Sequence, residues 1–203
     1  MAIKTEREYR TIQLPDIQFR AAEGEEENYI VEGYATTFND PYVMYEWEGV
    51  KYKEEIDRDA LLEADMSDVI FLYNHEGMVY ARQANGTLQL SPNDKGLYIR
   101  ADLSSTEASR QMFESIKAGL VTQMSWAFTI AEEEYDEKKH LRSIRKVNKV
   151  YDVSAVSIPA NPNTDISARS YWDGVIEEER RSERERAEKV ERIKNKLKGD
   201  VHE

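Results

Sequence analysis

Cysteine is absent from this chain of 203 residues. Its absence excludes disulfide bonds, thiolate nucleophiles, cysteine-ligated zinc and iron–sulfur clusters. Long apolar runs are absent too, because the longest is Val69–Tyr73 and a membrane span needs about 20 residues. The segment Met1–Arg10 is charged and holds no apolar core of the kind found in signal peptides. These absences predict a soluble, intracellular protein with no membrane partner.

Basic charge is also scarce, since 28 lysines and arginines face 40 acidic residues and leave a formal net charge of −12. So acidic a chain repels a phosphate backbone unless it carries a local basic face, and none is evident in the first 170 residues. Nucleic acid is therefore not an expected partner. The glycine patterns of dinucleotide and P-loop sites are missing, as are the histidine and acidic patterns of zinc and calcium sites. We expect no cofactor and no metal ion.

The composition changes sharply after Trp172, where the chain becomes dense in charge but nearly neutral overall. We expect a globular domain over residues 1–172 and a charged helical tail over residues 173–203, with one helix over residues 175–198. The apolar residues of this helix are too sparse for a core helix. They are Ile176, Ala187, Val190, Ile193 and Leu197. The helix is either solvated or packs against a partner, for example as a short coiled coil.

The globular part reads as short strands with helices between them. A firm helix is indicated from the capping-box pair Ser104 and Glu107 to Leu120, and a short helix over residues 54–64. Strands are expected at residues 29–38, 69–73, 87–90, 97–103, 123–131 and 147–158, with a charged excursion over residues 132–145. The layout predicts a mostly β (α+β) fold: an antiparallel β-barrel-like domain with inserted helices and a long charged C-terminal helix. A sandwich is the alternative.

Two residues on or beside these strands have the chemistry of a hydrolase. His75 directly follows the apolar run Val69–Tyr73, so a rigid element holds it near solvent, as a general base requires. Ser125 shares a small, hydroxyl-bearing strand face with Ala127 and Thr129, which leaves room for a substrate beside the hydroxyl. Taken singly, a histidine that ends a strand or a serine within one is more often an ordinary structural residue than a catalytic one.

Asp152 is the third candidate, because aspartate is depleted in strands and this one has apolar neighbours on both sides. A half-buried carboxylate needs a partner, which an imidazole N–H or an arginine would supply. The alternative to an imidazole is a salt bridge to Arg142 or Arg145.

Several short segments follow one another in an order and spacing that are specific when taken together. They are Val31–Ala35, Glu54–Ala60, Leu72–Glu76, Asp94–Leu97, Gly119–Phe128 and Val150–Ser154, the last running into Ile158–Pro162. Over about residues 28–165 the chain thus resembles the prohead (capsid maturation) serine proteases of tailed bacteriophages, whose fold is related to that of herpesvirus assemblin.

The resemblance implies a catalytic group of Ser125 as nucleophile, His75 as base and Asp152 as the acidic third member. Assemblin-like enzymes use a second histidine as the third member, which would be His140 here. Its neighbours Glu137–Lys139 are charged and indicate an exposed loop, which favours Asp152.

The chain departs from the family pattern at two positions. The family usually has glycine two residues after the nucleophile, where this chain has Ala127, and often has aspartate after the histidine, where this chain has Glu76. The first change adds a methyl group near the expected oxyanion region. The second lies outside the expected catalytic group.

The resemblance further implies a serine endopeptidase packaged in the procapsid, in the host cytoplasm. It would trim scaffold segments from the major capsid protein or a scaffold protein, and would cleave itself. A homodimer is implied by the assemblin relationship alone. The charged helix after Asp173 fits a segment that packs with the scaffold or is removed by self-cleavage.

Two other functions remain open at this point. One is a non-catalytic capsid assembly or scaffold protein on the same fold, which Ala127 and the long helix would suit. The other is a metal-dependent hydrolase centred on His75, which would be sensitive to chelators.

Overall fold

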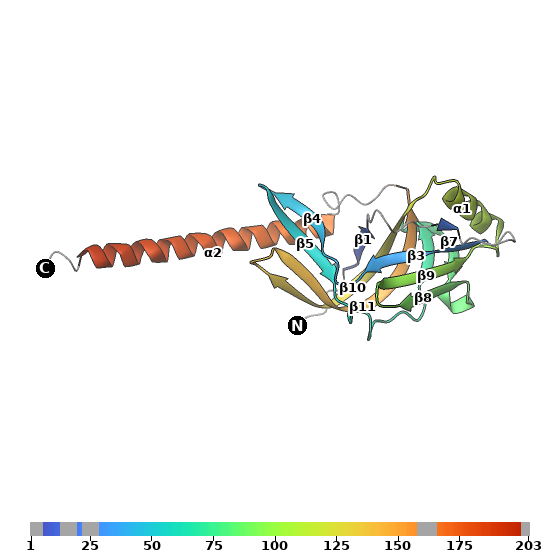
Figure 1. Cartoon of the computed structure of the whole chain (residues 1–203), viewed down its shortest axis with the longest axis horizontal. Coiled ribbons are helices and arrows are strands. Elements are labelled where there is room, and N and C mark those ends of the chain that lie inside the picture. Colours follow the sequence, from blue (N-terminus) through green and yellow to red (C-terminus); the bar gives the residue numbers. More distant parts are fainter. Residues whose placement is uncertain (1–5, 13–19, 22–28, 158–165, 200–203) are drawn as a thin grey trace.

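A computed structural model describes residues 6–12, 20–21, 29–157 and 166–199 of the chain. Eleven strands, two α-helices and one short 3-10 helix make up these residues. Figure 1 shows a body built from the strands, with α1 (Glu107–Lys117) at one end and α2 (Ile166–Gly199) projecting from the other. The quoted motif Ile158–Pro162 lies outside the described residues.

The strands form two sheets, one of which carries all three candidate catalytic residues. The larger, seven-stranded sheet has the order β1-β10-β11-β5-β4, with β6 paired to β11 and β7 to β6. The smaller sheet has the order β2-β3-β9-β8. The strands of the larger sheet are β1 (Glu8–Ile12), β4 (Tyr42–Trp47), β5 (Val50–Ile56), β6 (Ile70–Tyr73), β7 (Glu76–Arg82), β10 (Gln123–Asp136) and β11 (Leu141–Val156). Those of the smaller sheet are β2 (Arg20–Ala21), β3 (Ile30–Thr37), β8 (Leu88–Pro92) and β9 (Gly96–Asp102), with η1 (Gln83–Asn85) just before β8.

The mostly β character with a long C-terminal helix is confirmed, but the strand pairing differs from the expectation. Among the described strands the two sheets close no barrel. The larger sheet is mixed, because β11 pairs in parallel with β5 through Leu141–Ile144 and with β6 through Asp152–Ala155. The apolar pattern of a strand shows which face is buried but not which strand lies beside it, so one long strand with two different parallel neighbours could not be foreseen.

The prediction of a short helix over residues 54–64 is wrong. Glu54–Ile56 ends strand β5, and turns follow it. The helix after Ser104 is confirmed as α1, but its N-cap is Thr106, whose side chain accepts a hydrogen bond from the backbone N–H of Ser109 (3.0 Å). Three buried residues of α1, Met112, Phe113 and Ile116, join the main core, which also takes residues from both sheets.

The charged stretch over residues 132–145 is strand and turn rather than a loop excursion. Strands β10 and β11 continue through it as one long antiparallel hairpin with four register shifts. Cross-strand ion pairs line its exposed part, such as Lys146 with Glu132 (3.4 Å) and Arg145 with Glu134 (2.9 Å). High charge indicated a loop, but here opposite charges face each other across a ladder, which stabilises a sheet.

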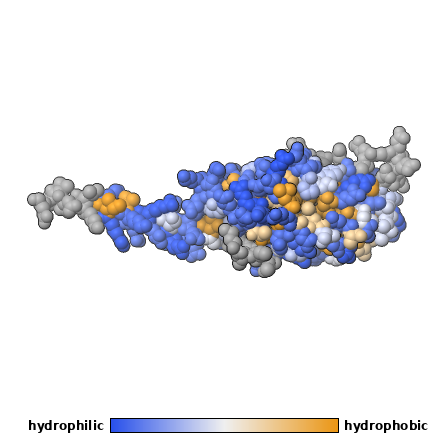
Figure 2. All heavy atoms as spheres, turned by 90° about the horizontal axis from the view of Figure 1, so that it is seen from below, coloured by the Kyte–Doolittle hydropathy of each residue, from blue (hydrophilic) through white to orange (hydrophobic). Residues whose placement is uncertain are grey.

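Helix α2 begins before the expected boundary after Trp172. Trp172 and Ile176 are buried against Met44, Tyr45 and Tyr52 of the β4–β5 hairpin in a second apolar cluster. Further along, Val190 and Ile193 are 50% and 58% exposed, and Figure 2 shows apolar atoms near the far end of the helix. No described helix is both long and apolar enough to cross a membrane. The division into a domain and a tail stays a prediction.

Candidate active site

Ser125 lies on β10, between β1 and β11. Its cross-strand partners are Thr11 on one side and Ser154 on the other. The neighbouring residues Trp126 and Phe128 stack on each other at 3.9 Å between ring centroids and are fully buried on their side of the strand. Large apolar side chains therefore anchor β10, as the alternating pattern predicted, and the serine projects from the opposite face.

His75 lies in the two-residue turn that joins β6 to β7. Tyr73 and Glu76 pair across the hairpin, and both central residues, Asn74 (φ 51°) and His75 (φ 61°), have a left-handed backbone. This is the requirement of a type I′ turn, and Asn and His adopt this backbone more often than most other non-glycine residues. The Asn74 side-chain oxygen accepts a hydrogen bond from the backbone N–H of Ser157 (3.1 Å), just past β11. The turn is thereby fixed to the strand that carries Asp152.

Asp152 lies on β11 where that strand pairs with β6, opposite Ile70. His75 Nδ1 is 2.7 Å from Asp152 Oδ1, and His75 Nε2 is 2.7 Å from Ser125 Oγ. The structure thus brings together three side chains that are far apart in the sequence. The arrangement is that of a hydroxyl, an imidazole and a carboxylate in a hydrogen-bonded row.

The geometry favours the imidazole tautomer that general-base chemistry needs. With Nδ1 beside a carboxylate, the neutral imidazole keeps its proton on Nδ1, and the lone pair on Nε2 is free to accept the proton of Ser125. Ser125 Oγ is also 2.9 Å from the backbone oxygen of Arg10 on β1, so its single proton has two acceptors within reach.

The group is closed to solvent on most sides. Ser125 has no exposed surface, the Asp152 side chain is 5% exposed and the His75 side chain is 16% exposed. The ring of Tyr9 meets the His75 imidazole edge-on at 4.8 Å between centroids. His75 is therefore the most exposed of the three side chains.

His140 is placed elsewhere, at the far end of the β10–β11 hairpin. Its Nδ1 is 3.2 Å from Glu179 Oε1 on α2 and 3.3 Å from the hydroxyl of Tyr135. Burial and the nearby Glu179 carboxylate raise the pKa of Tyr135 well above its usual range. The histidine alternative for the third member is thus not brought to Ser125.

The arginine alternatives for Asp152 do not contact it either. Arg145 pairs with Asp57 (2.5 Å), besides its cross-strand partner. Arg142 enters a buried cluster on the other face of the sheet, which we call the ion cluster. Its members are Glu8, Arg10, Glu54, Glu133 and Arg142.

The ion cluster lies behind the candidate site and ties β1 to the sheet. Arg142 reaches Glu8 (2.9 Å) and Glu54 (2.8 Å), and Arg10 holds the same two carboxylates. Burial alone would raise the pKa of Glu8, but Arg10 and Arg142 outweigh it and lower the value to about 2. The pKa of Glu54 is lowered in the same way. Arg10 therefore anchors β1 by its side chain, while its carbonyl oxygen lies 2.9 Å from Ser125 Oγ.

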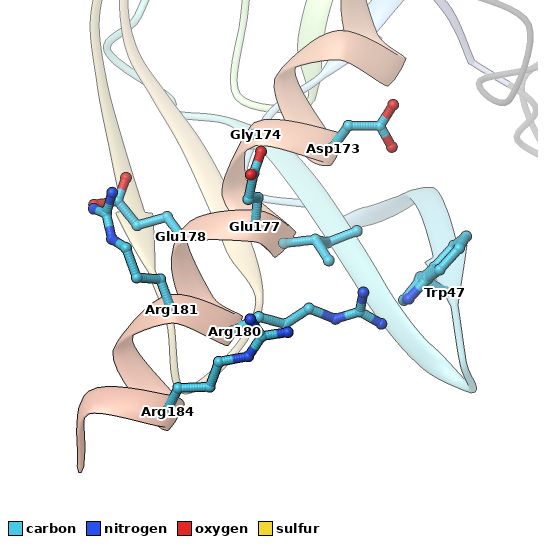
Figure 3. A pocket seen from close by; sticks show the side chains of 9 residues that line it. Trp47, Asp173, Gly174, Glu177, Glu178, Arg180, Arg181 and Arg184 are labelled. Carbon is cyan, nitrogen blue, oxygen red and sulfur yellow. The ribbon is translucent and has the colours of Figure 1, made fainter. Parts of the chain in front are cut away.

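A groove lies away from these residues. Its volume is about 640 Å³, and it runs between Trp47 at the end of β4 and residues 173–184 of α2. Figure 3 shows its acidic side chains, Asp173, Glu177 and Glu178, followed along α2 by its basic ones, Arg180, Arg181 and Arg184, so the groove presents no single charge to a ligand. Across the described part of the chain, no three His, Asp or Glu side chains are grouped to hold a metal ion.

Sequence reasoning missed two residues that contact the site, Tyr9 and Ser154. Ser154 had a usable signal, because it is two residues from Asp152 on one strand and so shares its face. Tyr9 had none, since the run around it is charged and was not expected to be a strand.

Comparisons with known proteins point to one family. A family model described as caudovirus prohead serine protease matches residues 15–174. The prohead protease of Enterobacteria phage HK97 is 25% identical over 153 residues, which are 75% of this chain and 65% of that protein. The chain therefore spans less than two thirds of the length of this relative. A solved structure, the capsid assembly protease of bacteriophage T4, aligns with a TM-score of 0.46 and 14% identity, covering 76% of this chain and 98% of that one.

Proposed function

The chain belongs to the caudovirus prohead serine protease family, and we propose that it is a serine endopeptidase of phage capsid maturation. The observation that carries the proposal is the pair of 2.7 Å contacts that His75 makes, with Ser125 Oγ through Nε2 and with Asp152 Oδ1 through Nδ1. A non-catalytic assembly protein has no need of such a row, with both contacts within the distance that proton transfer requires.

The proposed reaction is acyl transfer through a covalent intermediate. As Ser125 Oγ attacks the peptide carbonyl carbon, its proton passes to His75 Nε2, and the carbonyl electrons move onto the oxygen. Asp152 stays ionised and stabilises the imidazolium without taking the proton. His75 then gives the proton to the leaving amine, which breaks the C–N bond. A water molecule then attacks the carbonyl carbon of the acyl-enzyme while His75 accepts its proton. His75 returns that proton to Ser125 Oγ as the ester bond breaks, which restores the serine.

The substrates proposed for this activity are scaffold segments of the major capsid protein or a separate scaffold protein, and the chain itself. Its place of action would be the interior of the procapsid in the host cell, where enzyme and scaffold are enclosed together. A homodimer is proposed on the assemblin relationship alone. The family assignment supports capsid proteins as the substrate class.

The test is cleavage of a peptide library prepared from a bacterial proteome, with new N-termini identified by mass spectrometry. The purified chain should produce one set of related cleavage sites, and Ser125→Ala and His75→Ala should each abolish it. His140→Ala is the matched control, because His140 is hydrogen-bonded to α2 and not to the serine, and it should leave cleavage intact. Cleavage that survives Ser125→Ala would refute the proposal.

Self-cleavage has a separate test. The intact mass of the wild-type chain after expression is compared with that of Ser125→Ala. Self-cleavage predicts a shorter wild-type species whose missing part is a terminal segment, and a full-length variant. Identical masses under assembly conditions would count against it.

A further inference from the structure

One buried hydroxyl beside the candidate site has no role in the reaction just described. Ser154 lies on β11, two residues after Asp152 and directly opposite Ser125 in the β10–β11 ladder. It has no exposed surface. Its Oγ is 2.7 Å from Asp152 Oδ1 and 3.2 Å from His75 Nδ1.

With Asp152 ionised, the hydrogen-bond donors and acceptors of Ser154, Asp152 and His75 allow one arrangement of protons. The carboxylate only accepts, so the 2.7 Å contact requires Ser154 to donate its single proton to Oδ1. The same oxygen accepts the Nδ1 proton of His75. The Ser154 oxygen then presents a lone pair to Nδ1–H as a second, longer acceptor. A reversed imidazole tautomer would lose its bond to the carboxylate and keep only the weaker contact with Ser154.

We propose that Ser154 is a positioning residue of the proposed protease, which fixes the Asp152 carboxylate so that it holds His75 in the tautomer and orientation for proton transfer. Within the described residues, the Asp152 side chain accepts hydrogen bonds from two donors, His75 and Ser154. Removing the hydroxyl leaves a nearly buried carboxylate with a single donor and frees it to rotate about its Cβ–Cγ bond.

The inference deepens the proposed function and rests on it for its kinetic part. Its structural part, the orientation of His75, can be measured in the folded protein without any substrate. These two parts allow failure of the inference to be told from failure of the proposed function.

The experiment compares Ser154→Ala with Ser143→Ala. Ser143 lies on the same strand, is also buried, and donates to the Glu55 carboxylate at 2.7 Å, so the control removes an equal bond elsewhere. On a peptide found in the library, Ser154→Ala should lower kcat about 10- to 100-fold, the range expected for one hydrogen bond to a charged group. KM should stay within about twofold, since the substrate is not contacted. Ser143→Ala should change neither constant.

Nitrogen-15 NMR of the His75 imidazole reports which ring nitrogen carries the proton. A serine that only stabilised the fold would not change this tautomer. The wild-type signals should be those of a neutral ring protonated on Nδ1 alone. Ser154→Ala should show a mixture of the two tautomers, and Ser143→Ala should match the wild type. Adding Ser154→Ala to Asp152→Asn should cost little further activity, because the hydroxyl acts through that carboxylate.

The inference is overturned if Ser154→Ala keeps wild-type kcat and imidazole signals, or if its loss adds fully to that of Asp152→Asn. If Ser154→Ala lowers the melting temperature, the imidazole signals are compared below that temperature, where the variant is folded, and they still decide whether Ser154 orients His75. A wild-type chain that cleaves nothing, with the tautomer change present in Ser154→Ala, would refute the proposed function and retain the orienting role.

Discussion

At the residue scale, His75 connects a reactive hydroxyl to a buried carboxylate. Its ring nitrogens contact Ser125 and Asp152 at equal distances of 2.7 Å. Such a row works only when the carboxylate keeps the proton on Nδ1, because the other tautomer would present a proton to Ser125 instead of a lone pair. The identity of residue 152 should therefore matter more than its volume.

Asp152→Asn tests this directly. An asparagine amide fills the same space but can donate to Nδ1, which favours the wrong tautomer. We expect kcat on a library peptide to fall by about 10³–10⁴-fold with the melting temperature nearly unchanged. Arg145→Gln, which removes a partly exposed charge from the same strand, should leave kcat within about twofold. A mild loss in Asp152→Asn would mean that the carboxylate does not set the tautomer.

Residue types and their strand positions indicated the three candidates, and resemblance to a family gave them roles. What the sequence could not show was the surroundings of each atom. The left-handed backbone at His75 depends on a turn that Ser157 anchors, and the second acceptor for Ser125 is a main-chain carbonyl. Neither leaves a side-chain pattern. Ser154 could have been found from its spacing to Asp152.

At the element scale, β1 is held against β10 by charges buried behind the site. Arg10 and Arg142 each contact both Glu8 and Glu54, and Tyr42 donates to Glu54 (2.6 Å). Buried charges are costly unless paired, so removing one member leaves the others uncompensated. The backbone oxygen of Arg10 lies 2.9 Å from Ser125 Oγ. The ion cluster therefore helps to position the β1 backbone beside the serine.

Glu8→Gln should expose this linkage as a pH dependence. The folded-state pKa of Glu8 is about 2, below its ordinary 4.5, so its stabilising contribution is fully present above pH 4.5 and is lost as pH falls toward 2. At pH 7 the variant should unfold with about 3 kcal/mol less free energy than the wild type. That difference should shrink between pH 4.5 and 2, as measured by urea unfolding.

The control is Glu107→Gln, which removes an exposed i,i+3 partner of Arg110 on α1. Its unfolding free energy should match that of the wild type at each pH to within about 1 kcal/mol. A Glu8→Gln deficit that does not vary with pH would place the effect in packing rather than in charge.

Two glycines give a second prediction at this scale. A Cβ built on Gly96, at the start of β9, would come within 2.0 Å of the Thr36 backbone oxygen, whereas one on Gly174 of α2 meets nothing within 4 Å. Gly96→Ala should therefore lower the free energy of unfolding by about 1–3 kcal/mol or more. Gly174→Ala should raise it by about 0.5–1 kcal/mol, since alanine favours helix. Equal effects in thermal unfolding would show that the β3–β9 approach is not tight.

The elements that were foreseen are those whose pattern is local. The apolar run that became β6, the β8–β9 hairpin and the apolar face of α1 each lie within a short window of sequence. The failures depend on distant partners. The local pattern of residues 54–56 predicts a helix, but Glu54 lies on a strand and pairs with the distant Arg10 and Arg142. The charged tip of the β10–β11 hairpin is strand because opposite charges face each other across it.

At the scale of the whole molecule, α2 is attached to the body at one end only. Trp172 and Ile176 are buried on the β4–β5 hairpin, and Glu179 accepts hydrogen bonds from Tyr52 and Tyr135. Arg180 and Arg186 add ion pairs with Glu48 (3.1 Å) and Glu137 (3.9 Å), and beyond them the helix extends away from the strands in Figure 1. The sequence predicted the helix and its sparse apolar residues, but not that its first turns belong to the body.

Two separate changes to α2 should therefore differ strongly in their effect on the free energy of unfolding. One is Trp172→Ala, and the other is removal of residues 188–203. Trp172→Ala opens a cavity in the second apolar cluster and should cost about 3–5 kcal/mol of unfolding free energy. In the removed part, residues 188–194 are exposed, so the truncation should change the free energy of unfolding by about 0.5 kcal/mol or less. Urea unfolding followed by circular dichroism measures both. A large loss in the truncated chain would mean that the projecting part packs against the body.

The central claim is that Ser125, activated by His75, is the nucleophile of a serine protease. Its most direct test is a fluorophosphonate reagent, followed by intact mass and peptide mapping. The account predicts one phosphonyl group per chain, bound at Ser125, absent in Ser125→Ala and formed far more slowly in His75→Ala. An unmodified wild-type chain, or an equal adduct on Ser125→Ala, would contradict it.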